Sequence, residues 1–429
     1  MHVLIATVGS RGDVQPYVAL GVGLAAAGHR VTVNTSSRFE GVVREHGLAF
    51  APLSDGLLEL MDAQSGLIED MGRLRTAVPT ALRMLRETKD IQRDLVVDGW
   101  EAAREARPDL LLYHFKLPGS VHFADHLGIP AVLGALIPQL VPTSAWPAVG
   151  LPGGPGGAFN RATYRLALSA ARRVAAPHVD AWRRAHGLAP WPRGADVLHT
   201  PTGTPVPVLH GVSPHVVPHP SDWPDTAMMT GYWFLDTPDA TLPPALDAFL
   251  AAGAPPVYVG FGSMSGRQPE RLAATVVEAL DRAGLRGILA SGWGGLAPGA
   301  VPDSVHVVES VPHDALFPRV AAVVHHGGAG TTAAGLRAGR PTVVVPFFGD
   351  QPFWGARVRD LGVGPAPLPQ RRLTADGLAT ALRAAVNDAQ IRRRARALGR
   401  AIRAEDGVGS AVRLLETIVL QQGRAGGAG

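Results

Sequence analysis

A glycine-rich turn in the second half of the sequence carries its strongest signal for binding chemistry. The run AVVHHGGAGTTAAG spans residues 322–335, where an apolar pattern typical of a buried strand meets an alanine-rich helical pattern. Small residues let backbone N–H groups approach an anion, a helix N-terminus adds partial positive charge, and His326 and Thr331 can donate from their side chains. The turn lacks the P-loop lysine and the Gly-x-Gly-x-x-Gly spacing. It indicates a diphosphate site, and the alternative is a tight turn that uses glycine only for packing.

An acid–amide pair follows the next predicted strand. In PTVVVPFFGDQPFWG, residues 341–355, Asp350 and Gln351 lie in the loop after that strand. Open parallel sheets place ligand contacts at the carboxyl ends of their strands, and a carboxylate beside an amide suits hydrogen bonding to neighbouring sugar hydroxyls. Helix N-capping by Asp350 is the alternative.

Asp13 is the candidate general base. It lies in VGSRGDVQP, on a glycine-containing turn directly after the first predicted strand and before a helix. A carboxylate in this place can take a proton from a hydroxyl group. From the residues alone, a helix-capping aspartate is an equally good interpretation.

Three histidines, His114, His122 and His126, follow one predicted strand closely enough to suggest zinc. No carboxylate completes a catalytic zinc pattern there, so we interpret them as core or surface histidines and expect no metal.

Short apolar runs alternate with longer helical patterns along most of the chain. This alternation predicts parallel sheets covered by helices on both faces, and two such series predict an α/β protein with two doubly wound, Rossmann-like domains. The predicted strands are 3–8, 30–34, 110–113 and 131–136 in the first series, and 257–261, 287–290, 305–308, 322–325 and 342–346 in the second.

The domain boundaries follow from composition. We predict an N-terminal domain at 1–215, a proline-rich connection at 216–243 and a C-terminal domain at 244–405. A helix at 406–429 is expected to pack back on the N-terminal domain and to end in a frayed tail. The loop from Ile137 to Pro152 is apolar and rich in glycine and proline. We expect it to form a wall of an apolar binding pocket, and a surface loop with a few packed anchors is the alternative.

Composition excludes several classes of protein. The 429 residues are 46% hydrophobic and 18% charged, which is a globular balance, and the absence of cysteine excludes disulfides and thiolate chemistry. The net charge of +4 comes from arginines scattered among Ala and Gly, without the interleaved aromatic residues that favour nucleic-acid binding. No apolar run is long enough to span a bilayer, and the N-terminus lacks a signal-peptide pattern. We expect a cytoplasmic protein with at most peripheral membrane contact.

Several motifs, in order along the chain, resemble one family. HHGGAGTTAAGLRAG and PFFGDQPFWGARV resemble the donor-binding signature of GT-B-fold nucleotide-sugar glycosyltransferases. The resemblance is strongest to sterol 3-beta-glucosyltransferases and to bacterial enzymes that decorate polyketide and glycopeptide natural products. The further blocks that are similar, in sequence order, are GSRGDVQPYVALGVGLAAAGHRV, TGYWFLD, PPVYVGFGSM, SGWGGL and ESVPHDALFPRVAAVVHHGG. Residues 54–185 are similar to the family only loosely.

The resemblance implies roles for individual residues and two domains that face each other across a cleft. It places the donor diphosphate on His326, Gly328, Ala329, Gly330 and Thr331, with Ser263 near the same phosphates. It places the nucleotide base against Val311 and Trp293, and the transferred sugar on Asp350 and Gln351. It makes Asp13 the catalytic base. The ribose-binding glutamate of the plant small-molecule branch is replaced by Ala334, which fits the sterol-type and bacterial branches.

We therefore expect an inverting, metal-independent hexosyltransferase. Its donor is expected to be UDP-glucose, used as a co-substrate with no further cofactor, and its acceptor a lipophilic polycyclic or macrocyclic alcohol such as a sterol or a polyketide. Two alternatives are a dTDP-deoxysugar transferase of antibiotic biosynthesis and a non-catalytic nucleotide-sugar-binding auxiliary protein. A pyridoxal-dependent phosphorylase is excluded, because neither of the two lysines, Lys89 and Lys116, falls in the predicted second domain.

Overall fold

The computed structural model describes residues 1–63, 74–154, 156–237, 240–262, 268–292, 296–297 and 299–426, without the side chains of 61, 63, 74–88 and 423–426. The chain forms two compact units. The first consists of Met1–Asp62, Ala81–Leu235 and Asp406–Gly429, and the second of Ala63–Thr80 and Asp236–Glu405. Among the described residues, no helix is long and apolar enough to cross a membrane.

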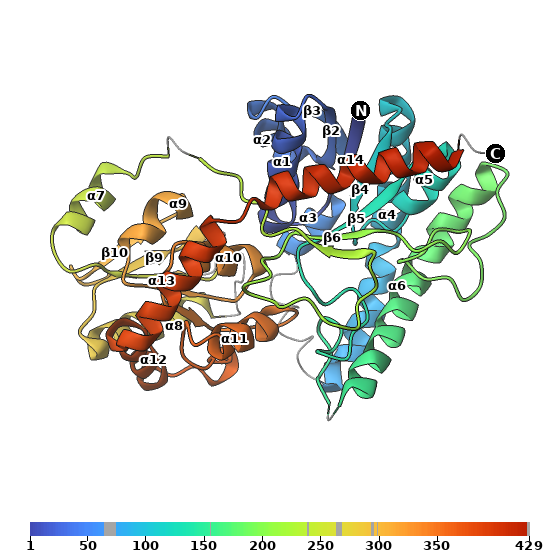
Figure 1. Cartoon of the computed structure of the whole chain (residues 1–429). Coiled ribbons are helices and arrows are strands. Elements are labelled where there is room, and N and C mark those ends of the chain that lie inside the picture. The colour runs from blue at the N-terminus through green and yellow to red at the C-terminus, as the bar shows by residue number, and fades with distance from the viewer. Residues whose placement is uncertain are drawn as a thin grey trace. The chain divides into compact units, whose positions relative to one another are not determined.

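The first unit is built on a seven-stranded, all-parallel sheet in the order β3-β2-β1-β4-β5-β6-β7 (Figure 1). Its strands are β1 His2–Ala6, β2 Arg30–Ser36, β3 Ala49–Leu53, β4 Leu110–His114, β5 Ala131–Ala135, β6 Val208–His210 and β7 Ala227–Met229. Its helices are α1 Arg11–Ala26, α2 Glu40–Glu45, α3 Gly56–Ala63, α4 Leu74–Ala106 (from Ala81 on), α5 Ser120–Leu127, α6 Gly157–Ala185 and α14 Gly407–Gly426, with the short η1 Ser37–Phe39.

Strand β1 shows why the sheet is covered on both faces. All five of its residues are buried, and successive side chains point to opposite faces. Val3 and Ile5 join the core cluster under α1 and α14, whereas Leu4 and Ala6 join the cluster that includes Leu95 of α4. A continuous apolar strand therefore requires helices on both sides.

Strand β7 lies within the stretch for which the sequence predicted a connection at 216–243. It pairs with β6, from Val208↔Ala227 to His210↔Met229, and forms an edge of the sheet. The first unit accordingly extends to Leu235. The sequence hid this strand, because it is only three residues long and follows a proline-rich stretch that ends at Pro224. An edge strand tolerates nearby prolines.

Helix α14 completes the first unit by packing against α1. Ala411, Val412 and Leu415 are buried in the same core cluster as Leu20 and Leu24 of α1. The close approach requires glycine at position 23, where a Cβ would lie 2.2 Å from Cγ1 of Val408. Figure 1 shows α14, in red, running along the first unit beside α1.

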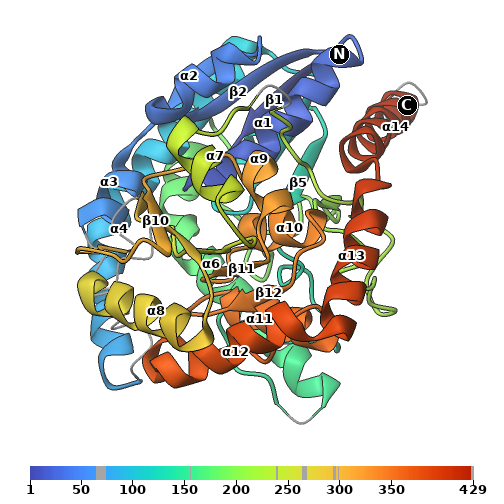
Figure 2. The same cartoon turned by 90° about the vertical axis from the view of Figure 1, so that its left-hand side faces the viewer.

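The second unit contains a five-stranded parallel sheet in the order β10-β9-β8-β11-β12 (Figure 2). Its strands are β8 Val257–Gly260, β9 Gly287–Ala290, β10 Val305–Val308, β11 Ala322–His325 and β12 Thr342–Val344. Its helices are α7 Pro244–Ala251, α8 Pro269–Ala283, α9 His313–Leu316, α10 Ala329–Arg337, α11 Gln351–Asp360, α12 Ala375–Asn387 and α13 Ala389–Arg403, with η4 Phe317–Arg319 and η5 Gln370–Arg372.

The second sheet is also covered on both faces. Val257 and Val259 of β8 pack with α8 and α12, which lie side by side in Figures 1 and 2. Tyr258 points to the opposite face and packs with Leu246 of α7 and Phe317. The predicted α/β class with two doubly wound sheets is confirmed.

Candidate functional site

The turn between β1 and α1 fixes one oxygen of Asp13. This residue lies in the first turn of α1, and Ser10 occupies the N-cap position. Oδ2 of Asp13 accepts hydrogen bonds from the backbone N–H of Ser10 at 2.8 Å and from the Ser10 hydroxyl at 3.0 Å. A side chain that reaches back to the N-cap amide is one half of a capping box. The helix-capping interpretation of Asp13 is thus correct for Oδ2, and Oδ1 makes different contacts.

Gly9 leaves the space that this arrangement needs. Its φ of +130° is a conformation that side-chain-bearing residues rarely adopt. A Cβ at this position would lie 2.3 Å from Oδ2 of Asp13 and 2.8 Å from Nζ of Lys116. Glycine is therefore required here both for the backbone conformation and for the close approach of two charged side chains.

The end of β4 provides the partners of the second oxygen. Strand β4 pairs with β1, with Ala6 opposite Tyr113, so the residues after Tyr113 lie beside the Asp13 turn. Nζ of Lys116 donates to Oδ1 of Asp13 at 2.9 Å, and Nε2 of His114 lies 3.5 Å from the same oxygen. The backbone N–H of Lys116 lies 3.4 Å from Nδ1 of His114 and donates to it. A neutral His114 ring then carries its hydrogen on Nε2, directed at Asp13.

Burial and these contacts determine the protonation states of His114 and Asp13. Burial and, to a smaller extent, the charge of Lys116 lower the pKa of His114 to about 3, although Asp13 opposes the shift. The ring is therefore neutral near pH 7. For Asp13, burial acts to raise the pKa, but the ammonium of Lys116 and the hydrogen bonds from Lys116 and Ser10 outweigh it, so the pKa is lowered. Asp13 is an anion near neutral pH, and its side chain is 22% exposed.

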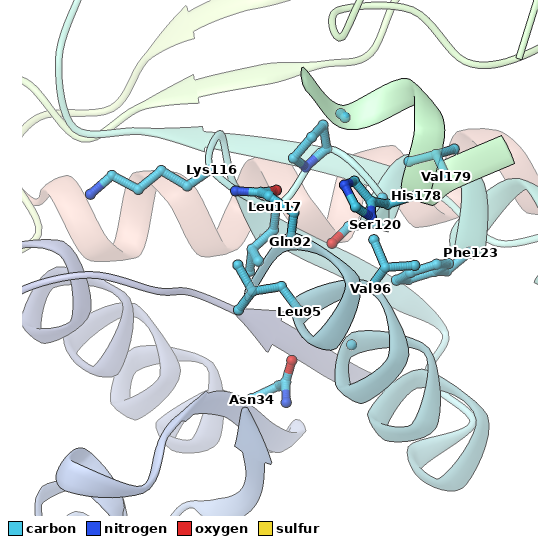
Figure 3. A pocket seen from close by; sticks show the side chains of 14 residues that line it. Asn34, Gln92, Leu95, Val96, Lys116, Leu117, Ser120, Phe123, His178 and Val179 are labelled. Atoms are coloured by element: carbon cyan, nitrogen blue, oxygen red, sulfur yellow. The ribbon is translucent and has the colours of Figure 1, made fainter. Parts of the chain in front are cut away.

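A small hollow lies next to Lys116 in the first unit. Apolar side chains dominate its lining, among them Leu95, Leu117, Phe123 and Val179. The side chain of Lys116 borders the hollow, and its ammonium extends away from the other labelled side chains (Figure 3). Lys116 therefore contacts both the hollow and the Asp13 carboxylate.

Hydrogen bonds and buried side chains hold the loop from Ile137 to Pro152 against the rest of the first unit. The Thr143 hydroxyl donates to Asp222 at 2.6 Å, and the N–H of Ala148 donates to the Thr163 hydroxyl of α6 at 2.9 Å. Val141 is buried in the core cluster of the first unit. These contacts fit the alternative of a surface loop with packed anchors, and the lining of the hollow in the described part of the chain comes from other segments.

In the second unit, the glycine-rich turn joins β11 to α10. The N–H of Gly327 donates to Nδ1 of His325 at 2.9 Å, and Gly327 has a φ of +96°. Gly328 is the N-cap, with its carbonyl accepting from the backbone N–H of Thr332 at 2.9 Å and from its hydroxyl at 2.8 Å. The amides of Ala329, Gly330 and Thr331 belong to the first helical turn and have no intrahelical acceptor. The predicted phosphate-binding residues are thus gathered at one helix N-terminus.

Two glycines leave the space in which the ring of His326 packs against this turn. A Cβ on Gly328 would lie 2.5 Å from Nε2 of His326, and one on Gly262 would lie 3.5 Å from Cε1. Burial lowers the pKa of His326 to about 4. Nδ1 is buried and has no hydrogen-bond partner among the described residues. The ring is therefore a neutral group that can donate one hydrogen bond.

The acid–amide pair lies at the start of α11. Oε1 of Gln351 accepts from the backbone N–H groups of Phe347 and Phe348, at 2.7 and 3.2 Å, and so holds the loop after β12. Asp350 occupies the N-cap position, but its side chain makes no capping hydrogen bond. Its Oδ2 accepts from the indole Nε1 of Trp354 at 2.7 Å instead. The N-capping alternative for the Asp350 side chain is therefore wrong.

Three further predicted contacts can be placed only in part. Ser263 and Trp293 lie outside the described residues. Val311 is half-buried in the segment after β10, where it packs against a core cluster of the second unit.

Sequence reasoning missed Lys116 and the role of His114. Both follow β4, whose position beside β1 could have been inferred from the doubly wound pattern, since ligand contacts cluster at the carboxyl ends of adjacent strands. The available signal was a lysine directly after a predicted strand in a chain that otherwise uses arginine almost throughout.

Comparison with known proteins covers both units. The Glycosyltransferase family 28 N-terminal domain matches residues 3–102, and the C-terminal domain of the erythromycin biosynthesis protein CIII-like family matches residues 295–409. The sterol 3-beta-glucosyltransferase of Emericella nidulans is 38% identical over 97% of this chain. The sterol 3-beta-glucosyltransferase UGT80A2 of Arabidopsis thaliana is 37% identical over 96% of it. The chain spans 30% of the fungal relative and 65% of the plant relative.

Solved structures agree on the fold. The glycosyltransferase of kitacinnamycin has a TM-score of 0.72 at 23% identity and covers 97% of this chain and 98% of its own. The calicheamicin glycosyltransferase CalG4 has a TM-score of 0.68 at 19% identity, with 98% of each chain covered. The chain belongs to the GT-B-fold nucleotide-sugar glycosyltransferases, with sterol 3-beta-glucosyltransferases among its sequence relatives and bacterial natural-product glycosyltransferases among its structural ones.

Proposed function

We propose that the protein is an inverting glycosyltransferase that moves a hexose from UDP-glucose to a hydroxyl of a lipophilic polycyclic or macrocyclic alcohol. The observation that carries this proposal is the Asp13 carboxylate, which is partly exposed, held at both oxygens and ionised near neutral pH. A general base requires this combination of access and charge. Relatives named sterol 3-beta-glucosyltransferase support glucose as the sugar and a sterol-like acceptor.

The proposed reaction is one displacement. Oδ1 of Asp13 takes the proton from the acceptor hydroxyl while that oxygen forms a bond to the anomeric carbon of the donor. The bond from this carbon to the phosphate oxygen breaks, and its electron pair leaves with the nucleoside diphosphate. Attack opposite the leaving group inverts the anomeric centre.

The second unit is proposed to bind the donor. The first-turn amides of α10 and the neutral ring of His326 donate hydrogen bonds to the diphosphate, which gains charge as it leaves. Because these donors are fixed before the reaction, we propose that transfer needs neither a metal ion nor a cofactor. Asp350 and Gln351 are the proposed contacts of the transferred sugar, and Ser263, Trp293 and Val311 keep the roles that the resemblance implies.

The acceptor is proposed to bind in the first unit, because Asp13 lies there. The hollow beside Lys116 provides an apolar surface in the same unit, and Lys116 contacts this carboxylate. Burying the apolar part of the acceptor against it would add binding energy in proportion to the area removed from water.

The test is an assay with radiolabelled UDP-glucose and three alcohols, namely a sterol, a macrolide aglycone and a small water-soluble phenol, with and without EDTA. We expect a sterol or macrolide β-glucoside, unchanged by EDTA, with its configuration read from the anomeric proton coupling. A parallel series with dTDP-glucose distinguishes a thymidine-specific enzyme. Binding of either nucleotide sugar without turnover of any alcohol would instead support a non-catalytic auxiliary protein.

A further inference from the structure

Lys116 is the charged residue closest to the proposed base, and the reaction described above assigns it no role. Its ammonium lies 2.9 Å from Oδ1 of Asp13, and the two side chains are 32% and 22% exposed. Oδ2 already accepts two hydrogen bonds from Ser10, which fill both of its lone-pair directions. Oδ1 is therefore the oxygen that can exchange a partner for an incoming hydroxyl.

The surroundings of Oδ1 are asymmetric. His114 approaches it from the protein interior, with a side chain only 1% exposed, at the long distance of 3.5 Å. Lys116 approaches it from the accessible side at 2.9 Å. An acceptor hydroxyl that reaches Oδ1 from the exposed side meets Lys116 there, so the hydroxyl and the ammonium would share this oxygen.

The lysine is also built into the turn. Gly9 provides the space for its Nζ, since a Cβ there would lie 2.8 Å from that atom. Its backbone N–H orients His114. Its side chain borders the apolar hollow, and its ammonium extends away from the other labelled side chains (Figure 3). The same ammonium donates to Oδ1 of Asp13.

We propose that Lys116 is a positioning residue, which holds Oδ1 of Asp13 as a charged proton acceptor and directs it to the side from which the acceptor arrives. This inference rests on the proposed function of Asp13 as the base. Lys116 takes no proton itself. Its charge stabilises the Asp13 anion. Its hydrogen bond to Oδ1 weakens when the acceptor hydroxyl donates to the same oxygen.

Few other charged groups act on Asp13. Burial acts first to raise the pKa of Asp13, and Lys116 is the main opposing charge. His114 is neutral, because burial lowers its pKa to about 3. Tyr17 is neutral as well, since burial raises its pKa well above the ordinary value, and its hydroxyl donates to the carbonyl of Gly134. Arg11 is exposed on α1 and donates to Gln15. Without the ammonium, the hydrogen bonds from Ser10 would remain, but the largest influence that opposes the burial of the carboxylate would be lost.

The test replaces the charge and keeps the shape. In Lys116→Met, the pKa of Asp13 should rise, which is the usual effect of losing an adjacent opposite charge. The acid limb of the kcat/KM profile with UDP-glucose and the active alcohol should then move to higher pH than in the wild type. At higher pH the loss should shrink, because the carboxylate is again ionised. Lys116→Arg should keep the wild-type profile, and Lys89→Met, an exposed lysine of α4, is the matched control.

A second readout does not depend on activity. The carboxyl ¹³C signal of Asp13, assigned by its absence in Asp13→Asn, should titrate at a higher pH in Lys116→Met than in the wild type. Lys116→Gln, which is polar but uncharged, should behave like Lys116→Met and replaces it if that variant does not fold. An unchanged Asp13 titration in both variants would overturn the proposal. Inactivity of the wild type toward every alcohol, with the titration shifted as expected, would overturn the proposed function instead and leave the charge effect established.

Discussion

Nε2 of His114 lies 3.5 Å from Oδ1 of Asp13 at the carboxyl ends of two adjacent parallel strands. The contact joins a buried, neutral ring to a partly exposed anion. Because the ring is fixed inside the sheet and the carboxylate is held by the start of α1, the position of the proposed base depends on the register of β1 with β4. The chemistry of the first unit is thus set by strand pairing as much as by the identity of residue 13.

Asp13→Asn should lower kcat by about 100-fold or more, because the amide keeps the shape but cannot accept the proton. Affinity for UDP, measured by calorimetry, should stay unchanged, because the diphosphate contacts are proposed in the second unit. Asp225→Asn, an exposed aspartate of the first unit, is the control. Near-normal turnover in Asp13→Asn would contradict the assignment of the base.

Gly9→Ala should disturb the site and the fold together. The new Cβ would clash with Asp13 and Lys116, and the positive φ would add strain of about 1 to 3 kcal/mol. Gly28→Ala is the matched variant, since Gly28 has a φ of +84° with no atom within 4 Å of the added Cβ. Urea unfolding should show both variants destabilised, and Gly9→Ala more so. Turnover should fall in Gly9→Ala alone, and equal turnover in the two variants would argue against the packing described around Gly9.

His326→Ala and Gly328→Ala should both weaken UDP binding by about tenfold or more, as expected for a lost hydrogen bond to a charged group. The first removes the proposed donor, and the second displaces it, because a Cβ on Gly328 would lie 2.5 Å from Nε2. Calorimetric titration with UDP measures the effect. His306→Ala, at a histidine of β10 stacked on Phe249, is the control in the same unit. Wild-type affinity in both test variants would exclude the phosphate-binding role of this turn.

Stability should fall as the pH drops below about 6.5. In this range the histidines of the unfolded chain bind protons, whereas the same histidines stay neutral when they are buried in the folded protein. Burial lowers the pKa of His210 to about 3 from its ordinary value of 6.5. Each such histidine destabilises the folded state by up to about 1.4 kcal/mol per pH unit in this range.

His210→Phe removes one of these groups and keeps an aromatic ring for the stack on Trp223, whose centroid lies 4.4 Å away. Its melting temperature should depend less on pH between about 5 and 7 than that of the wild type. His215→Phe, at an exposed site, should retain the wild-type slope. Equal slopes in all three proteins would show that His210 does not resist protonation.

Leu415→Ala should destabilise the first unit by about 2 to 5 kcal/mol, because it opens a cavity between α14 and α1. Leu415 is completely buried in that core, whereas Leu420 on the same helix is 66% exposed. Urea unfolding of Leu415→Ala and Leu420→Ala therefore compares two leucine truncations in one helix. A similar, small change in both would mean that α14 does not complete the core.

The sequence predicted the parts of the fold that have strong local signals. The ranges 287–290, 305–308 and 322–325 coincide with β9, β10 and β11, because each is a short apolar run bounded by breaks in the pattern. It missed β3 and β6, which have proline inside or directly beside them, and β7, which is only three residues long. Pairing with an existing sheet edge overrides local propensity there.

The site was predictable to a similar extent. The turn at Asp13 and the helix start at Gly328 follow from local residue types. The ion pair of Asp13 with Lys116 joins residues 103 positions apart and depends on which strands are neighbours. The contact between Asp350 and Trp354 spans a single helical turn, but nothing in the residue types favoured it over capping.

The packing of α14 on α1 has a consequence for how the protein is made. Residues 1–235 leave the ribosome with the apolar face of α1 uncovered, and the whole second unit must be synthesised before α14 follows. The second unit can close its own core during translation, whereas the first must wait with Leu20 and Leu24 exposed on one side. Chaperone binding during synthesis should therefore concentrate on the first unit until α14 has emerged.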